Sequence, residues 1–163
     1  MIVRSDLIPK KDGMRVGIAV DGSPQSKAVV RYILNNLDFF GKDSKFYLIH
    51  VTSDISLTLL AGVSTGAPQP LKGTDLEAIK EETYREATED IVPMLDKAGI
   101  EYEKVCVEGT PGDVLAKVAK KKKLSLMVMG THGYGRFKSA VLGSTAMRPV
   151  SYTHLTLPTN SLG

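Results

Sequence analysis

Short apolar runs alternate along the chain with segments whose apolar residues recur at helical spacing. Four runs have strand length and end in glycine, proline or other turn residues, so we expect strands at residues 15–20, 45–51, 101–107 and 124–129. Strands that lack a polar face are typical of a parallel sheet covered on both sides. The pattern therefore predicts a doubly wound, Rossmann-like α/β domain, with its ligand beyond the carboxyl ends of the strands.

The segments between these strands predict helices at residues 26–37, 74–98 and 113–121, with a fourth from about Phe137. Ser23 is expected to cap the first helix, with Pro24 at its first position. A capping box at residues 74–77 should start the second helix, which Pro93 should kink and Gly99 should end. Residues 52–72 are rich in Ser, Thr, Gly and Pro, which indicates a long loop.

Composition narrows the class of protein. The chain has 163 residues, 42% of them hydrophobic and 24% charged, which suits one globular domain. A net charge of +3 is too small to indicate nucleic acid, and the lysine run at residues 120–123 falls where a helix should end. No apolar run has the length of a membrane span or signal peptide, and Cys106 has no partner for a disulfide. We therefore expect a cytoplasmic protein without nucleic-acid or membrane partners.

A glycine-rich segment follows the fourth strand. Gly130-Thr131-His132-Gly133 is followed ten residues later by Gly143-Ser144-Thr145, inside a predicted helix. The glycines would let a bulky anion approach the backbone and would allow positive φ, and a new helix starting at Ser144 would offer N–H groups to phosphate. Ordinary loop glycines and a broken helix explain the same residues equally well. Neither of the strict phosphate motifs, G-x-x-x-x-G-K-[ST] or G-x-G-x-x-G after the first strand, is present.

Four segments together resemble one known family. The pattern Gly130-x2-Gly133-x9-Gly143-Ser144 is similar to the ATP-binding motif of the universal stress protein family, and residues 126–133 resemble its fourth strand. Residues 19–24, residues 50–51 and residues 108–111 match the family after its first three strands, in order and spacing. The resemblance covers about residues 14–147 and implies a domain at residues 1–146 that binds ATP, often with Mg²⁺ or Mn²⁺.

The resemblance also implies which residues hold the nucleotide. Adenine would lie against the backbone of Ala19, Val20, Asp21 and Val51, and ribose near Asp21, Met129 and Gly130. The phosphates would rest on Gly133, Gly143, Ser144 and Thr145.

Single residues near these segments have two interpretations each. Asp21 is either a turn residue or a ligand-binding residue that accepts from a ribose hydroxyl or holds a water of bound Mg²⁺, and its position after a buried strand favours ligand binding. His132 lies in the glycine segment without a neighbouring nucleophile, which favours phosphate or solvent contact over catalysis. Arg136 and Lys138 either reach a phosphate or solvate the start of a helix. His50 is expected to pack at the end of the second strand.

The tail departs from the family. Pro149 is expected to stop the last helix, and the Thr-rich residues 151–160 do not resemble the family's fifth strand. We expect residues 147–163 to be an atypical tail, non-native through out-of-frame or appended translation, with a divergent terminus as the alternative. Because the family's fifth strand commonly pairs across a homodimer, the loss of that strand puts the expected dimer in doubt.

Three functions are compatible with these residues. The first is an ATP-binding regulatory or stress-response module with little or no turnover, which fits the lack of a general base or metal-ligand cluster. The second is a slow ATPase or phosphotransferase in the same pocket, with Asp21 or His132 positioning the nucleophile. The third is a nucleotide-free interaction module whose glycines are structural.

Overall fold

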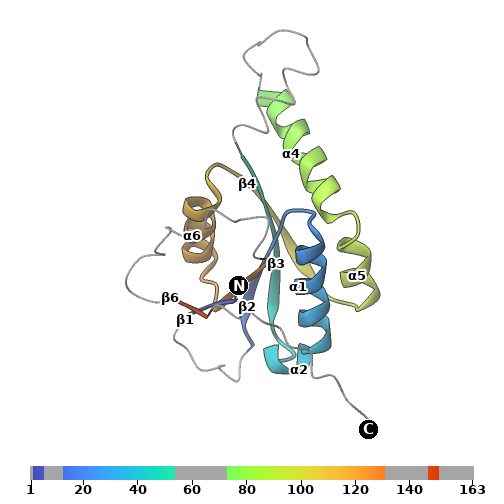
Figure 1. Ribbon diagram of the computed structural model, residues 1–163, viewed down its shortest axis with the longest axis vertical. Helices are drawn as coiled ribbons and strands as arrows, with labels where there is room; N and C mark the ends of the chain where they lie inside the picture. Colours follow the sequence, from blue (N-terminus) through green and yellow to red (C-terminus); the bar gives the residue numbers. More distant parts are fainter. Residues whose placement is uncertain (1, 6–12, 54–72, 131–146, 151–163) are drawn as a thin grey trace.

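The computed structural model describes residues 2–5, 13–53, 73–130 and 147–150 (Figure 1). Its strands form one sheet, and they are β1 (Ile2–Ser5), β2 (Arg15–Val20), β3 (Lys45–Thr52), β4 (Tyr102–Glu108), β5 (Leu126–Met129) and β6 (Met147–Val150). Its helices are α1 (Pro24–Asn35), α2 (Leu37–Phe40), α4 (Gly73–Thr88), α5 (Val92–Lys97) and α6 (Pro111–Lys122).

The sheet has the strand order β4-β3-β2-β5-β1-β6. The four strands predicted from the sequence are mutually parallel, with β2 between β3 and β5 and with β4 at the edge beyond β3. In register, Val20 lies beside His50 and Ala19 beside Met129, so the carboxyl ends of three strands meet at one edge of the sheet. This confirms the predicted α/β class.

Helices cover both faces of this sheet, with α1, α4 and α5 on one side and α6 on the other (Figure 1). Successive side chains of a strand point to opposite faces, and the buried residues divide accordingly. Val16, Ile18 and Val20 join the core under α1, α4 and α5, whereas Ala19 joins the core under α6. Both faces of each central strand are thus removed from water, which explains why these strands are apolar at nearly every position.

The start of α1 follows the sequence prediction. Ser23 is its N-cap, and the side-chain oxygen of Ser23 accepts a hydrogen bond from the backbone N–H of Ser26. Pro24 occupies the first turn, where its missing N–H would have no helical partner. The helix closes at Asn36, whose N–H donates to Ile33, and α2 follows as a separate short helix.

The prediction of one kinked helix over residues 74–98 is wrong, because the structure has two helices there. Helix α4 ends at Thr88, and α5 begins at Val92 with Pro93 in its first turn. A proline inside a continuous helix would lack an N–H for the helical hydrogen bond and would crowd the carbonyl of the preceding turn. In the first turn of α5 there is no preceding turn, so neither effect destabilises the helix. Gly99 then follows α5 with φ +66°, the left-handed conformation expected after a helix.

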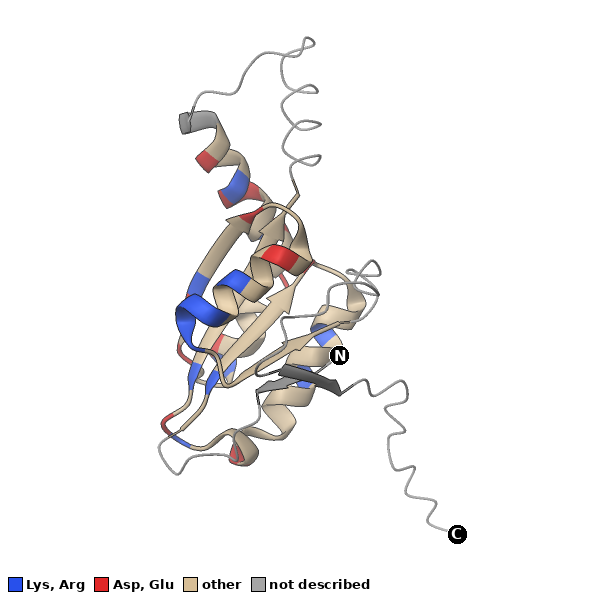
Figure 2. Ribbon diagram, turned by 90° about the vertical axis from the view of Figure 1, so that its left-hand side faces the viewer, with Lys and Arg blue, Asp and Glu red and all other residues tan. Residues whose placement is uncertain are grey.

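The lysine run lies at the end of α6, as predicted. Lys120, Lys121 and Lys122 form the last turn, and Lys123 closes the helix in the left-handed conformation. Asp113 lies in the first turn, so the charges at both ends complement the helix dipole. Figure 2 faces this helix and shows the basic residues gathered at that end.

Two further strands, β1 and β6, were not predicted. Strand β1 pairs antiparallel with β5, and β6 pairs antiparallel with β1. Pro149 was expected to stop a helix, but it lies in β6 at the sheet edge, where proline is tolerated. The predicted helix from Phe137 and most of the predicted loop at residues 52–72 lie outside the described residues. No helix within the described ranges is both long and apolar enough to cross a bilayer.

Candidate functional site

A pocket of about 420 Å³ opens at the carboxyl ends of β2 and β3. Doubly wound sheets bind their ligands at the carboxyl ends of the strands, at the point where the strand order reverses. The pocket is lined by the loop after β2, the end of β3, α4 and the start of α6, namely Asp21, Gly22, His50, Val51, Thr52, Ser53, Thr83, Glu86, Ala87 and Pro111.

Asp21 is held in place at the entrance to α1. Its Oδ1 accepts hydrogen bonds from the backbone N–H of Ser23 at 3.0 Å and from the hydroxyl of Ser26 at 2.6 Å. Burial raises the pKa of the Asp21 carboxyl, but the hydrogen bonds from Ser23 and Ser26 outweigh it and lower the pKa overall. Asp21 is therefore a fixed, ionised acceptor at the pocket.

His50 also lines the pocket, and it joins β3 to β2. Its Nδ1 lies 3.0 Å from the carbonyl oxygen of Val20, and its ring meets the ring of Tyr84 edge-on with centroids 6.5 Å apart. It is 8% exposed, so it packs at the strand end as predicted. Burial lowers the pKa of His50, although the bond to Val20 and the charge of Asp21 raise it. The sequence pattern around His50 does not indicate that this side chain lines the pocket.

The far wall of the pocket is α4. The hydroxyls of Thr52 and Thr83 lie 3.2 Å apart and join the end of β3 to this helix. Gly22 has φ +78°, and a Cβ there would lie 3.3 Å from the Cα of Ala87. A glycine at this turn therefore lets the loop after β2 pass close to α4.

The described lining of the pocket carries hydrogen-bond acceptors and no lysine or arginine. Its ionisable residues are Asp21, His50 and Glu86. A carboxylate favours partners that donate hydrogen bonds and repels phosphate. This part of the pocket therefore suits the uncharged end of a ligand, rich in hydroxyl and amino groups.

The model of the universal stress protein family matches residues 14–155. This chain belongs to the universal stress protein family. A universal stress protein of Methanocaldococcus jannaschii is 29% identical over 140 residues, which are 86% of this chain and 77% of that protein.

Solved structures show the same fold. A universal stress protein family member from Burkholderia pseudomallei aligns with a TM-score of 0.53 and 20% identity, over 78% of this chain and 89% of its own. A family protein from Arabidopsis thaliana with AMP bound aligns with a TM-score of 0.51 and 18% identity, over 78% and 82%.

The described half of the predicted site in this universal stress protein comes together at one edge. Asp21 and Val51 line the pocket. Ala19, Val20 and Met129 lie at the neighbouring strand ends and are at most 1% exposed. The predicted phosphate-binding residues His132, Gly133, Gly143, Ser144 and Thr145 lie outside the described residues, as do Arg136 and Lys138.

Gly130 has a structural reason to be glycine. A Cβ at this position would lie 2.8 Å from the Cβ of Gln25 and 3.0 Å from its carbonyl carbon. Its φ is not positive, so the backbone freedom that glycine allows is not what this position uses. The residue is small so that the end of β5 can pack against the first turn of α1.

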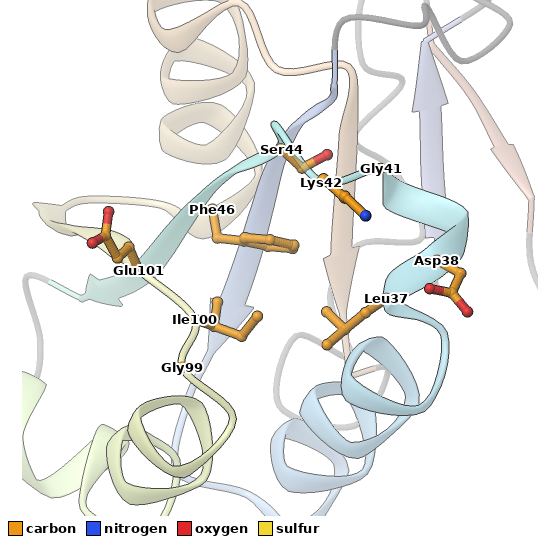
Figure 3. A pocket seen from close by; sticks show the side chains of 9 residues that line it. All are labelled: Leu37, Asp38, Gly41, Lys42, Ser44, Phe46, Gly99, Ile100 and Glu101. Atoms are coloured by element: carbon orange, nitrogen blue, oxygen red, sulfur yellow. The ribbon is translucent and has the colours of Figure 1, made fainter.

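A second hollow, of about 500 Å³, lies at the opposite end of the strands. Figure 3 shows Leu37, Phe46 and Ile100 on its walls, with charged side chains such as Asp38 and Glu101 around them. It lies at the amino ends of β3 and β4, away from the edge where this fold binds ligands.

The described residues contain no group of three or more His, Cys, Asp or Glu side chains that could hold a metal ion. Mg²⁺ is often held by one or two carboxylates together with phosphate oxygens and water. A divalent cation here would thus depend mainly on a ligand's phosphates.

Proposed function

We propose that this protein binds ATP or a related adenine nucleotide at the carboxyl ends of β2, β3 and β5. The nucleoside end occupies the pocket beside Asp21, and the phosphates extend from Gly130 toward Gly133, Gly143, Ser144 and Thr145. The bound nucleotide serves a regulatory, stress-response role with little or no turnover.

The observation that carries this proposal is the fixed carboxylate of Asp21 at the pocket. With Oδ1 occupied by Ser23 and Ser26, the second carboxylate oxygen is available to accept from a ribose hydroxyl. The acceptor-rich lining favours the nucleoside end over the phosphates. A related fold with AMP bound supports an adenine nucleotide as the ligand.

The geometry of Asp21 favours binding over rapid chemistry. Hydrogen bonds that stabilise its ionised form make it a weak base. His50 already uses one ring nitrogen to bind Val20, which suits a positioning role. Mg²⁺ or Mn²⁺, if bound with the triphosphate, would neutralise its charge.

Two measurements test the proposal. Mass spectrometry of ligand released from freshly purified protein should find an adenine nucleotide, and calorimetry with added ATP should show saturable binding. Gly133→Val should weaken that binding by blocking close approach to the backbone. Purified protein that carries no nucleotide and shows no binding of millimolar ATP would contradict the proposal. Multiple-turnover phosphate release would contradict its claim of low turnover.

A further inference from the structure

His50 has an unused ring nitrogen at the pocket. A backbone carbonyl accepts hydrogen bonds and cannot donate them, so the 3.0 Å contact with Val20 places the proton on Nδ1. In the neutral ring, Nε2 then carries a lone pair and is an acceptor.

Burial and contacts indicate that Nε2 faces the pocket. Among the described residues, the Tyr84 hydroxyl is the only buried side-chain polar atom without a hydrogen-bond partner. Within the described ranges the hydrogen bond of the His50 ring is the one to Val20, which leaves Nε2 available for a ligand. Since His50 lines the pocket and is otherwise buried, the pocket is the place from which it is reached.

Two contacts hold the ring, and a third residue lies beside it in the sheet. Val20 holds Nδ1, the ring of Tyr84 packs edge-on from α4, and Cys106 is its register neighbour on β4. The Asp21 carboxylate is near enough to act on the charge of His50. A pre-positioned acceptor loses little freedom when a ligand binds, which favours selective recognition.

We infer that His50 Nε2 is a specificity-determining acceptor of the nucleotide pocket, which together with Asp21 recognises two hydrogen-bond donors on the nucleoside end of the ligand. This inference rests on the proposed function. The two donors on the ligand are either two ribose hydroxyls or one ribose hydroxyl and the exocyclic amine of adenine. Loss of either donor would leave a partly buried acceptor unpaired, which disfavours the wrong ligand.

The test uses a matched pair of variants of the full chain. His50→Asn keeps an amide donor near the position of Nδ1 but has no group at the position of Nε2. His50→Gln places an amide near the position of Nε2. Calorimetry with ATP should show an affinity about tenfold lower for His50→Asn, with a smaller loss for His50→Gln.

Ligand analogues identify the donor that His50 recognises. Deoxy-ATP analogues lack one ribose hydroxyl, and inosine triphosphate lacks the exocyclic amine. One of them should bind wild type more weakly than ATP, while His50→Asn should not distinguish that analogue from ATP. If His50→Asn binds every ligand with wild-type affinity, the inference is overturned while the proposed function stands. If wild type binds no adenine nucleotide, both fail.

A pH series on wild type is independent of variant folding. Protonation converts Nε2 to a donor, and because the pKa of His50 is lowered, adenosine binding should hold near neutral pH and weaken only as the pH falls toward about 5. Asp21, Glu86, Tyr84 and Cys106 are the other titratable groups around this ring. Burial raises the pKa of both Tyr84 and Cys106, and the pKa of Asp21 lies below its usual value, so these three keep their charge across the range. Adenosine binding that strengthens as the pH falls would overturn the inference.

Discussion

The hydroxyl of Ser26 donates to Oδ1 of Asp21 over 2.6 Å, and the backbone N–H of Asp21 donates back to that hydroxyl over 3.1 Å. This reciprocal pair ties the loop after β2 to the first turn of α1. Because Ser26 is 1% exposed, its hydroxyl acts on the pocket by holding Asp21.

Ser26→Ala should destabilise the fold by about 1–3 kcal/mol at neutral pH, because it leaves buried hydrogen-bonding groups unpaired. The folded pKa of Asp21 is lowered, so its stabilising contribution is present above its unfolded pKa and is lost as the pH falls through the folded value. Urea unfolding should show the difference from wild type shrinking below about pH 4. An undiminished difference at acid pH would contradict this coupling.

Asp21→Asn should weaken ATP binding about tenfold or more, because the amide offers a weaker acceptor than the carboxylate. Asp38→Asn is the matched control, since Asp38 lines the hollow at the opposite end of the strands. Calorimetry on both variants checks the expectation. Equal losses of affinity in Asp21→Asn and Asp38→Asn would contradict a specific role of Asp21 in binding.

Gly130→Ala should cost about 1–3 kcal/mol, because the added methyl group would meet the backbone and Cβ of Gln25. Gly99→Ala provides a contrast, since nothing lies within 4 Å of its Cβ position but its φ of +66° disfavours alanine. That conformational cost is about 1 kcal/mol. Chemical denaturation of both variants separates crowding from backbone strain, and a neutral Gly130→Ala would refute the proposed packing.

Tyr84→Phe should be neutral or slightly stabilising, because the Tyr84 hydroxyl is buried without a hydrogen-bond partner. Burial, the largest cause, raises the pKa of this tyrosine. A raised folded pKa means that stability is full below the unfolded value of about 10 and falls as the pH rises above it. Tyr84→Phe should therefore lose less stability in alkali than wild type, whereas the exposed Tyr32→Phe should behave as wild type does.

The proposal that residues 147–163 are an appended tail predicts a different reading frame in the source gene. Resequencing the gene is the direct measurement. An uninterrupted frame that encodes this same tail would refute it, and the strand pairing of β6 with β1 would then belong to the native fold.

The parallel strands could be predicted because their local signals agree with their burial. Residues such as Ile18 and Leu48 are buried on one face while Ala19 and Ile49 are buried on the other, so the strands appear as continuous apolar runs. Helix α1 was predictable from Ser23 and Pro24, which act within one turn.

Features that depend on distant residues could not be predicted. The antiparallel partner of β5 is a segment at the other end of the chain, and no local pattern specifies that pairing. The need for glycine at Gly130 arises from Gln25 on α1. Likewise, His50 was recognised as a packed residue, but its pocket-facing role depends on where the Val20 carbonyl lies.

The central position of β2 has a consequence for synthesis on the ribosome. Val16 can pair with Phe46 once both have been synthesised, but its other neighbour, Leu126, emerges only after α6. During that interval one edge of an apolar strand has no hydrogen-bonding partner, and such edges promote association with other chains. Slow translation between β3 and β5 should therefore lower the yield of folded protein, and chaperones that cover apolar segments should restore it.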